Sequence, residues 1–107
     1  MGRPLEHPPR EALELPAVLH ALSDPVRLKI VARLAAEGGE RACGSLDLPV
    51  TKSTSSHHFK VLREAGVIHQ RECGTQRLTS VRVDDLEARF PGLLGAVLAA
   101  APAAAAA

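Results

Sequence analysis

The chain has 107 residues, a formal net charge of +1, two Phe, and neither Trp nor Tyr. This length fits one small domain near the lower limit for burying a useful core alone, so support from a partner subunit is expected. The scarcity of aromatic side chains disfavours a binder of single-stranded nucleic acid, which usually stacks bases on aromatic rings.

The first ten residues are rich in proline and polar side chains and contain no apolar signal core. Glu6 also breaks the pattern required for myristoylation. We therefore expect a flexible arm over residues 1–10 of a cytoplasmic protein with no membrane contact.

Two helices are predicted before residue 38. The first covers Glu11 to Leu22, where apolar residues recur at helical spacing. The second opens at Asp24-Pro25, because the carboxylate can cap the helix and proline at the first helical position loses no hydrogen bond. Its buried stripe is Val26, Ile30, Val31 and Leu34. Arg27 falls inside this stripe, so we expect its stem to pack with the head in solvent, or its head to pair with a carboxylate.

Residues 51–66 predict a helix with two opposed faces. Thr51 can cap its first turn, and Gly66 suits the left-handed residue just past its last turn. The outward face carries Ser53, Ser56, His57 and Lys60, whose polar groups can bond phosphates and base edges. The opposite face carries Ser55, Phe59 and Leu62 and is expected to pack in the core, with the Ser55 hydroxyl bonded back to a backbone carbonyl.

A β-hairpin is predicted directly after this helix, from residues 67–71 and 76–83. Gly74 permits the positive φ that a tight turn needs. Residues 52–82 contain six cations and two anions, a net charge of +4, so the basic part of the chain coincides with the helix and hairpin. The candidate DNA contacts are Lys52, Ser53, Ser56, His57, Lys60, Arg63, Arg71, Gln76 and Arg77.

Two stretches carry a family pattern, from Ala21 to Ile30 (ALSDPVRLKI) and from Ser56 to Ile68 (SHHFKVLREAGVI). Together with the hairpin, they resemble the ArsR/SmtB family of bacterial winged-helix repressors. The resemblance implies an α+β winged helix-turn-helix fold, mainly helical with a small β-hairpin. It also implies a homodimeric regulator of transcription that binds specific sequences of duplex DNA and commonly responds to a metal ion or another small signal.

Two departures from the family pattern concern the effector. Gly44 and Pro49 bracket only four residues, which leaves room for a single turn instead of the usual scaffold helix. Cys43 has no neighbouring cysteine, Cys73 lies in the hairpin turn, and both are interpreted as inert thiols. A metal effector such as nickel or zinc would then need nitrogen and oxygen ligands, for which the candidates are His7, His20, Asp84 and Asp85. The alternative is a regulator without a metal effector, controlled by a partner protein or by thiol oxidation.

The last helical segment begins at Asp84-Asp85, whose charges suit a helix N-terminus, and Pro91-Gly92 should break or kink it. We expect no spare core to cover its apolar face in so small a domain, and assign that face, with the first helix, to a two-fold dimer interface. The alternative is packing on its own monomer. Residues 11–98 form the predicted domain, and the tail 99–107, rich in alanine, should fray. The interface candidates are Leu15, Val18, Leu19, Leu93, Leu94, Val97 and Leu98.

No catalytic site is predicted. Ser56 and His57 are neighbours, but adjacent helical residues point about 100° apart and no acid is placed to orient the imidazole. The other alternative to a DNA-binding regulator is a winged-helix protein-interaction module. Salt-dependent affinity for duplex DNA would separate these two classes.

Overall fold

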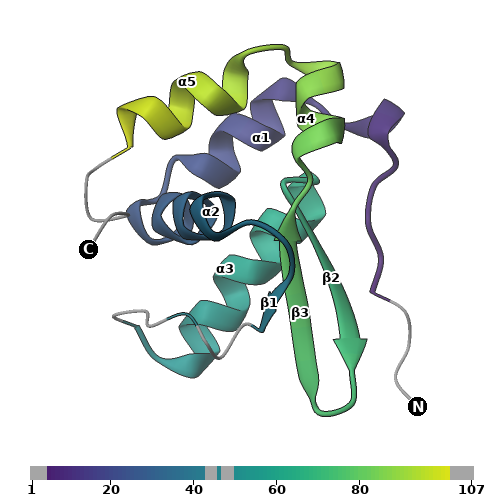
Figure 1. Cartoon of the computed structure of the whole chain (residues 1–107), viewed down its shortest axis with the longest axis vertical. Coiled ribbons are helices and arrows are strands. Elements are labelled where there is room, and N and C mark those ends of the chain that lie inside the picture. The colour runs from purple at the N-terminus through teal and green to yellow at the C-terminus, as the bar shows by residue number, and fades with distance from the viewer. Residues whose placement is uncertain (1–4, 43–45, 47–49, 102–107) are drawn as a thin grey trace.

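Helices surround one apolar core, and a β-hairpin projects from them (Figure 1). The structure, a computed structural model, describes residues 5–42, 46 and 50–101. In these residues the elements are a 3₁₀ turn η1 (Arg10–Ala12), α1 (Leu15–Leu22), α2 (Pro25–Glu37), β1 (Arg41–Ala42), α3 (Lys52–Ala65), β2 (Ile68–Cys73), β3 (Gln76–Val81), α4 (Val83–Arg89) and α5 (Leu93–Ala100).

The predicted caps of α2 and α3 are confirmed. Asp24 accepts hydrogen bonds from the backbone amides of residues 26 and 27 at 2.9 and 3.1 Å, and Pro25 is the first residue of α2. The Thr51 hydroxyl accepts from the amide of Thr54 at 3.3 Å, and Gly66 ends α3 in the left-handed region at φ 85°. These local signals fix where α2 and α3 begin and where α3 ends.

The first predicted helix is wrong at its N-terminal end. Residues 10–12 form the short η1 turn, Leu13 and Glu14 are extended, and α1 begins only at Leu15. Pro16 explains the late start, because proline has no amide hydrogen to donate to the carbonyl four residues earlier and is therefore tolerated only in the first turn of a helix, where it stands in α1.

The sheet is antiparallel with strand order β1-β3-β2. Cys73 pairs with Gln76 across a two-residue turn in which Gly74 has φ 63°, as predicted for a tight hairpin. The second strand ends at Val81 and not at Val83, because α4 begins there. β1 was not predicted, since two residues are too few to show an alternating pattern. The predicted single turn over 44–49 lies, apart from Leu46, outside the described residues, and so does the predicted fraying beyond residue 101.

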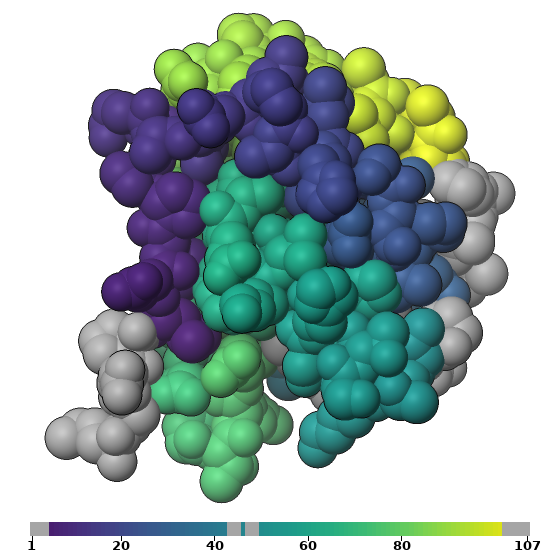
Figure 2. All heavy atoms as spheres, turned by 180° about the vertical axis from the view of Figure 1, so that it is seen from behind, coloured from purple at the N-terminus to yellow at the C-terminus, as the bar shows by residue number. Residues whose placement is uncertain are grey.

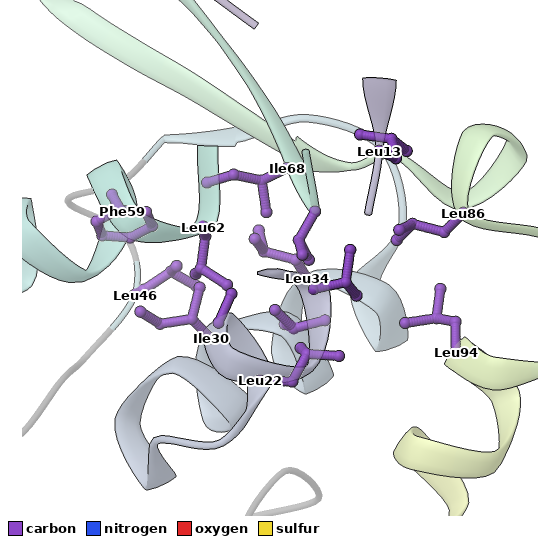
Figure 3. Packing of buried hydrophobic residues seen from close by; sticks show 14 residues of the cluster. Leu13, Leu22, Ile30, Leu34, Leu46, Phe59, Leu62, Ile68, Leu86 and Leu94 are labelled. Atoms are coloured by element: carbon purple, nitrogen blue, oxygen red, sulfur yellow. The ribbon is translucent and has the colours of Figure 1, made fainter. Parts of the chain in front are cut away.

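The core is built mainly from aliphatic side chains of the helices, of β2 and of the segments between them, with Phe59 at one side, and Figure 3 shows how they converge. The labelled core residues are Leu13, Leu22, Ile30, Leu34, Leu46, Phe59, Leu62, Ile68, Leu86 and Leu94.

Arg27 is also buried, which confirms a structural role. Its guanidinium group, however, neither reaches solvent nor pairs with a carboxylate, the two arrangements expected from the sequence. Its Nε and Nη2 donate to the carbonyls of Ala21 at 2.7 Å and His20 at 3.3 Å, and Nη1 lies 3.2 Å from Nδ1 of His58. Arg27 therefore joins the last turn of α1 to α2 and α3.

The break after α4 is confirmed, since Arg89 ends that helix and Gly92, at φ 82°, precedes α5. Val18 and Leu94 are only 1% and 7% exposed and belong to the core of the single chain, which corrects their assignment to the dimer interface. Leu15 and Leu19 are 41% and 44% exposed. Three further candidates, Leu93, Val97 and Leu98, are half-buried. No helix within the described ranges is long and apolar enough to cross a membrane.

Candidate nucleic-acid interface

The N-terminal half of α3 and the turn of the β2–β3 hairpin lie at the same end of the molecule (Figure 1). A groove of about 320 Å³ lies between them. Figure 2 shows the hairpin tip and the start of α3 as two lobes with this hollow between them. The groove is lined by Lys52, Ser55, Ser56, Phe59, Gln70, Glu72, Gly74, Thr75, Gln76 and Arg77.

The polar face of α3 is exposed as expected. Ser53, Ser56, His57 and Lys60 all point to solvent, whereas Phe59 and Leu62 are buried at 5% and 0%. Ser55 is half-buried, and its hydroxyl donates to the carbonyl of Lys52 at 3.0 Å, so a small polar residue is accommodated on the packed face. The start of α3 thus offers free polar groups beside the positive end of a helix dipole.

The predicted DNA-binding cations differ in whether their side chains already have partners among the described residues. Lys52 and Lys60 are exposed and form no ion pair with any described residue. Arg77 lies 3.4 Å from a carboxylate oxygen of Glu72 on the opposite strand of the hairpin. Arg63 is half-buried and donates to Oε1 of Gln70 at 2.7 Å, so its charge is directed at the hairpin and not at solvent.

Arg71 is held by a partner that the sequence analysis missed. Its Nε and Nη2 donate to the two carboxylate oxygens of Glu40 at 2.7 and 2.9 Å. These hydrogen bonds lower the pKa of Glu40 and raise that of Arg71. The two residues are 31 positions apart, and Glu40 stands just before β1, a strand with no sequence signal, so nothing in the sequence pointed to this pair.

The predicted metal ligands do not come together within the described part of the chain. Nε2 of His7 accepts from the backbone amide of Gln70 at 2.9 Å. The carboxylate of Asp85 pairs with Arg10 at 2.7 Å and Arg82 at 2.9 Å, and the hydrogen bonds from these two arginines lower its pKa. His20 and Asp84 are exposed. No three His, Cys, Asp or Glu side chains among the described residues could share a metal ion.

Of the two cysteines, Cys73 belongs to the described residues and Cys43 lies outside them. Cys73 is a free, exposed thiol, and it is the last residue of β2, paired with Gln76, whereas the sequence analysis placed it in the hairpin turn itself.

Sequence and structure comparisons give a consistent set of relatives. A family model described as a helix-turn-helix domain matches residues 22–71. The uncharacterized HTH-type transcriptional regulator YceK of Bacillus subtilis is 38% identical over 79 residues, which cover 72% of this chain and 79% of YceK.

Two solved structures share the fold. The transcriptional repressor BigR from Xylella fastidiosa has a TM-score of 0.56 at 29% identity, covering 71% of this chain and 85% of that one. An ArsR family transcriptional regulator has a TM-score of 0.60 at 20% identity, covering 85% and 92%, a likeness that concerns the fold alone. The winged helix-turn-helix architecture expected from the sequence is thereby confirmed.

Proposed function

The chain belongs to the family of HTH-type transcriptional regulators, and on this premise we propose that it is a repressor of the ArsR type that binds duplex DNA between α3 and the β2–β3 hairpin. Members of this family bind DNA and are not enzymes, so the chain is a DNA-binding regulator.

The observation that carries this proposal is the groove between α3 and the hairpin, with exposed cations on both walls. Lys52 lies on the helix side and Arg77 on the hairpin side. A recognition helix enters the major groove with its N-terminal residues against base edges, which would place Ser53, Ser56 and His57 at the bases. Lys60, one turn further on the same face, would meet a phosphate.

When DNA binds, its phosphates must replace carboxylates as the partners of two arginines. Glu72 lines the groove beside Arg77, and Glu40 holds Arg71. Exposed ion pairs of this kind contribute little to stability, so a phosphate can replace the carboxylate at small cost. Lys52 and Lys60, which have no such partner among the described residues, would supply the larger share of the affinity.

We further propose a homodimer formed through α1 and α5. Leu15 and Leu19 are exposed on α1, and Leu93, Val97 and Leu98 are half-buried on α5. These helices lie at the end of the molecule opposite the hairpin turn (Figure 1). A two-fold axis there leaves both grooves free, so the operator should contain two related half-sites.

A nickel or zinc effector stays a prediction, with regulation by a partner protein or by thiol oxidation as the alternative. His20 and Asp84 are the exposed members of the predicted ligand set, and a second copy of the chain would have to bring further ligands to them. Titration calorimetry with each metal, on the wild type and on His20→Ala, tests this. Equal heats for both proteins would contradict a role for His20.

The proposed function is tested by the affinity of the purified protein for duplex DNA at several salt concentrations, measured by fluorescence anisotropy. Binding that weakens steeply with salt and prefers one duplex sequence over unrelated duplexes supports the groove as the DNA site. An affinity for protein partners, without salt-dependent affinity for duplex DNA, would favour the interaction module instead. Whether the protein represses is tested by transcription in vitro from a promoter that it binds, where adding the protein should lower the amount of transcript.

A further inference from the structure

The segment before α1 lies against α3 and the hairpin instead of standing free. It is the segment in purple in Figure 2, beside the α3 surface and reaching the hairpin. Arg82 Nη1 donates to the carbonyl of Pro8 at 2.8 Å, and Arg10 pairs with Asp85 at 2.7 Å. Leu13, at the end of the segment, is 1% exposed and packs so closely on Gly66 that a Cβ there would collide with it. We call residues 5–13 the strap.

His7 makes the contact between the strap and the hairpin. Its ring stacks on that of His69, with the centroids 4.4 Å apart and the planes inclined by 16°. Its Nε2 accepts from the backbone amide of Gln70 at 2.9 Å. β2 is an edge strand of the sheet, so its outer side pairs with no other described strand, and His7 binds the Gln70 amide there. The imidazole thus caps a donor on the sheet edge.

Gln70 connects this contact to the groove. It is 1% exposed, its Oε1 accepts from Arg63 of α3 at 2.7 Å, and its Nε2 donates to Oγ1 of Thr79 in β3 at 3.1 Å. It also lines the groove between α3 and the hairpin. A single side chain and its backbone therefore join the strap, the recognition helix and both long strands of the wing.

We propose that the strap is part of the DNA-binding module and that His7 is a positioning residue, which fixes the hairpin relative to α3 through the Gln70 amide. This inference rests on the proposed function, since it assigns the strap the task of holding the two walls of the DNA groove at their working distance. His7 does not itself line that groove.

The surroundings of His7 favour the neutral ring that this contact needs. Burial lowers the pKa of His7 most, and the nearby cations Arg82 and Arg63 and the ring of His69 lower it further, against a hydrogen bond with the Leu5 backbone that raises it. Glu6 and Glu64 line the hollow beside the ring and are the acidic groups that face it. A neutral imidazole keeps a lone pair on Nε2 for the Gln70 amide.

Two substitutions separate the hydrogen bond from the ring stack. His7→Phe keeps a flat ring on His69 but has no acceptor. His7→Gln loses the ring but can place a carbonyl oxygen near the position of Nε2. We expect His7→Phe to weaken DNA binding about threefold to tenfold, the effect of one lost hydrogen bond, and His7→Gln to stay within about twofold of the wild type.

Amide hydrogen exchange followed by NMR supplies a second readout on the full chain without DNA. In His7→Phe the Gln70 amide should exchange at least several times faster than in the wild type, while amides inside the β2–β3 ladder keep their rates. Unchanged Gln70 exchange, or His7→Phe and the wild type binding DNA equally well, would overturn the proposal. If the wild type bound no duplex DNA, the proposed function would fail, whereas the exchange rates would still decide whether His7 holds β2.

Discussion

Replacing Lys60 by Ala should weaken DNA binding and flatten its dependence on salt. Lys60 is exposed on the outward face of α3 and has no ion-pair partner in the described part of the chain, so its full charge is available to a phosphate. Each phosphate contact contributes about 0.9 to the slope of log K against log salt concentration. The proposed dimer carries two copies of Lys60, so the slope should fall by about 1.8. Between 50 and 200 mM salt, the variant should therefore lose about tenfold less affinity than the wild type.

The assay is fluorescence anisotropy of a labelled operator duplex at four or more salt concentrations and constant pH. Arg33→Ala is the matched control, because Arg33 is a cation on α2 that pairs with Glu37 and does not line the groove. Arg77→Ala should reduce the slope as well, and it leaves Glu72 facing the phosphates, which adds repulsion. A Lys60→Ala variant that is folded and has the slope of the wild type would refute the placement of DNA against α3.

Three further predictions concern assembly, packing and pH. Leu19→Glu should give a folded monomer in sedimentation, because Leu19 is 44% exposed in the single chain, and an intact dimer would put the interface elsewhere. Gly66→Ala should lower the free energy of unfolding in urea by about 1–3 kcal/mol or more, since a Cβ there meets Leu13 and φ is 85°; unchanged stability would show that the strap does not pack there. The pKa of the docked His7 ring is lowered from 6.5, so docking of the strap should be strongest above about pH 6.5 and should weaken as the pH falls below that value. The Gln70 amide should then exchange faster at acidic pH, after correction for the intrinsic exchange rate. A corrected rate that does not change with pH would contradict this.

The parts of the site predicted from the sequence depend on local chemistry. Capping by Thr51, the left-handed Gly66 and the opposed faces of α3 are all set within about one turn of helix, so they are legible without tertiary structure. The hairpin turn at Gly74 and the break at Gly92 belong to the same class, because each follows from the conformational freedom of glycine in a short stretch.

The parts that were missed depend on contacts between distant segments. His7 and Gln70 are 63 positions apart, and Glu40 and Arg71 are 31 apart, and neither pair carries a periodic signal. The burial of Leu94 was missed for a different reason. α5 is apolar nearly all round, so its sequence does not say which row of side chains faces the core of its own chain.

Selection of genomic DNA fragments by the purified protein, followed by affinity measurement on the enriched sequence, tests sequence-specific DNA binding most directly. The expected result is one or a few promoters with two related half-sites, bound at least about a thousandfold more tightly than unrelated duplex at physiological salt. Enrichment of no particular sequence, or equal affinity for the selected duplex and a scrambled one, would contradict the role of the groove between α3 and the hairpin.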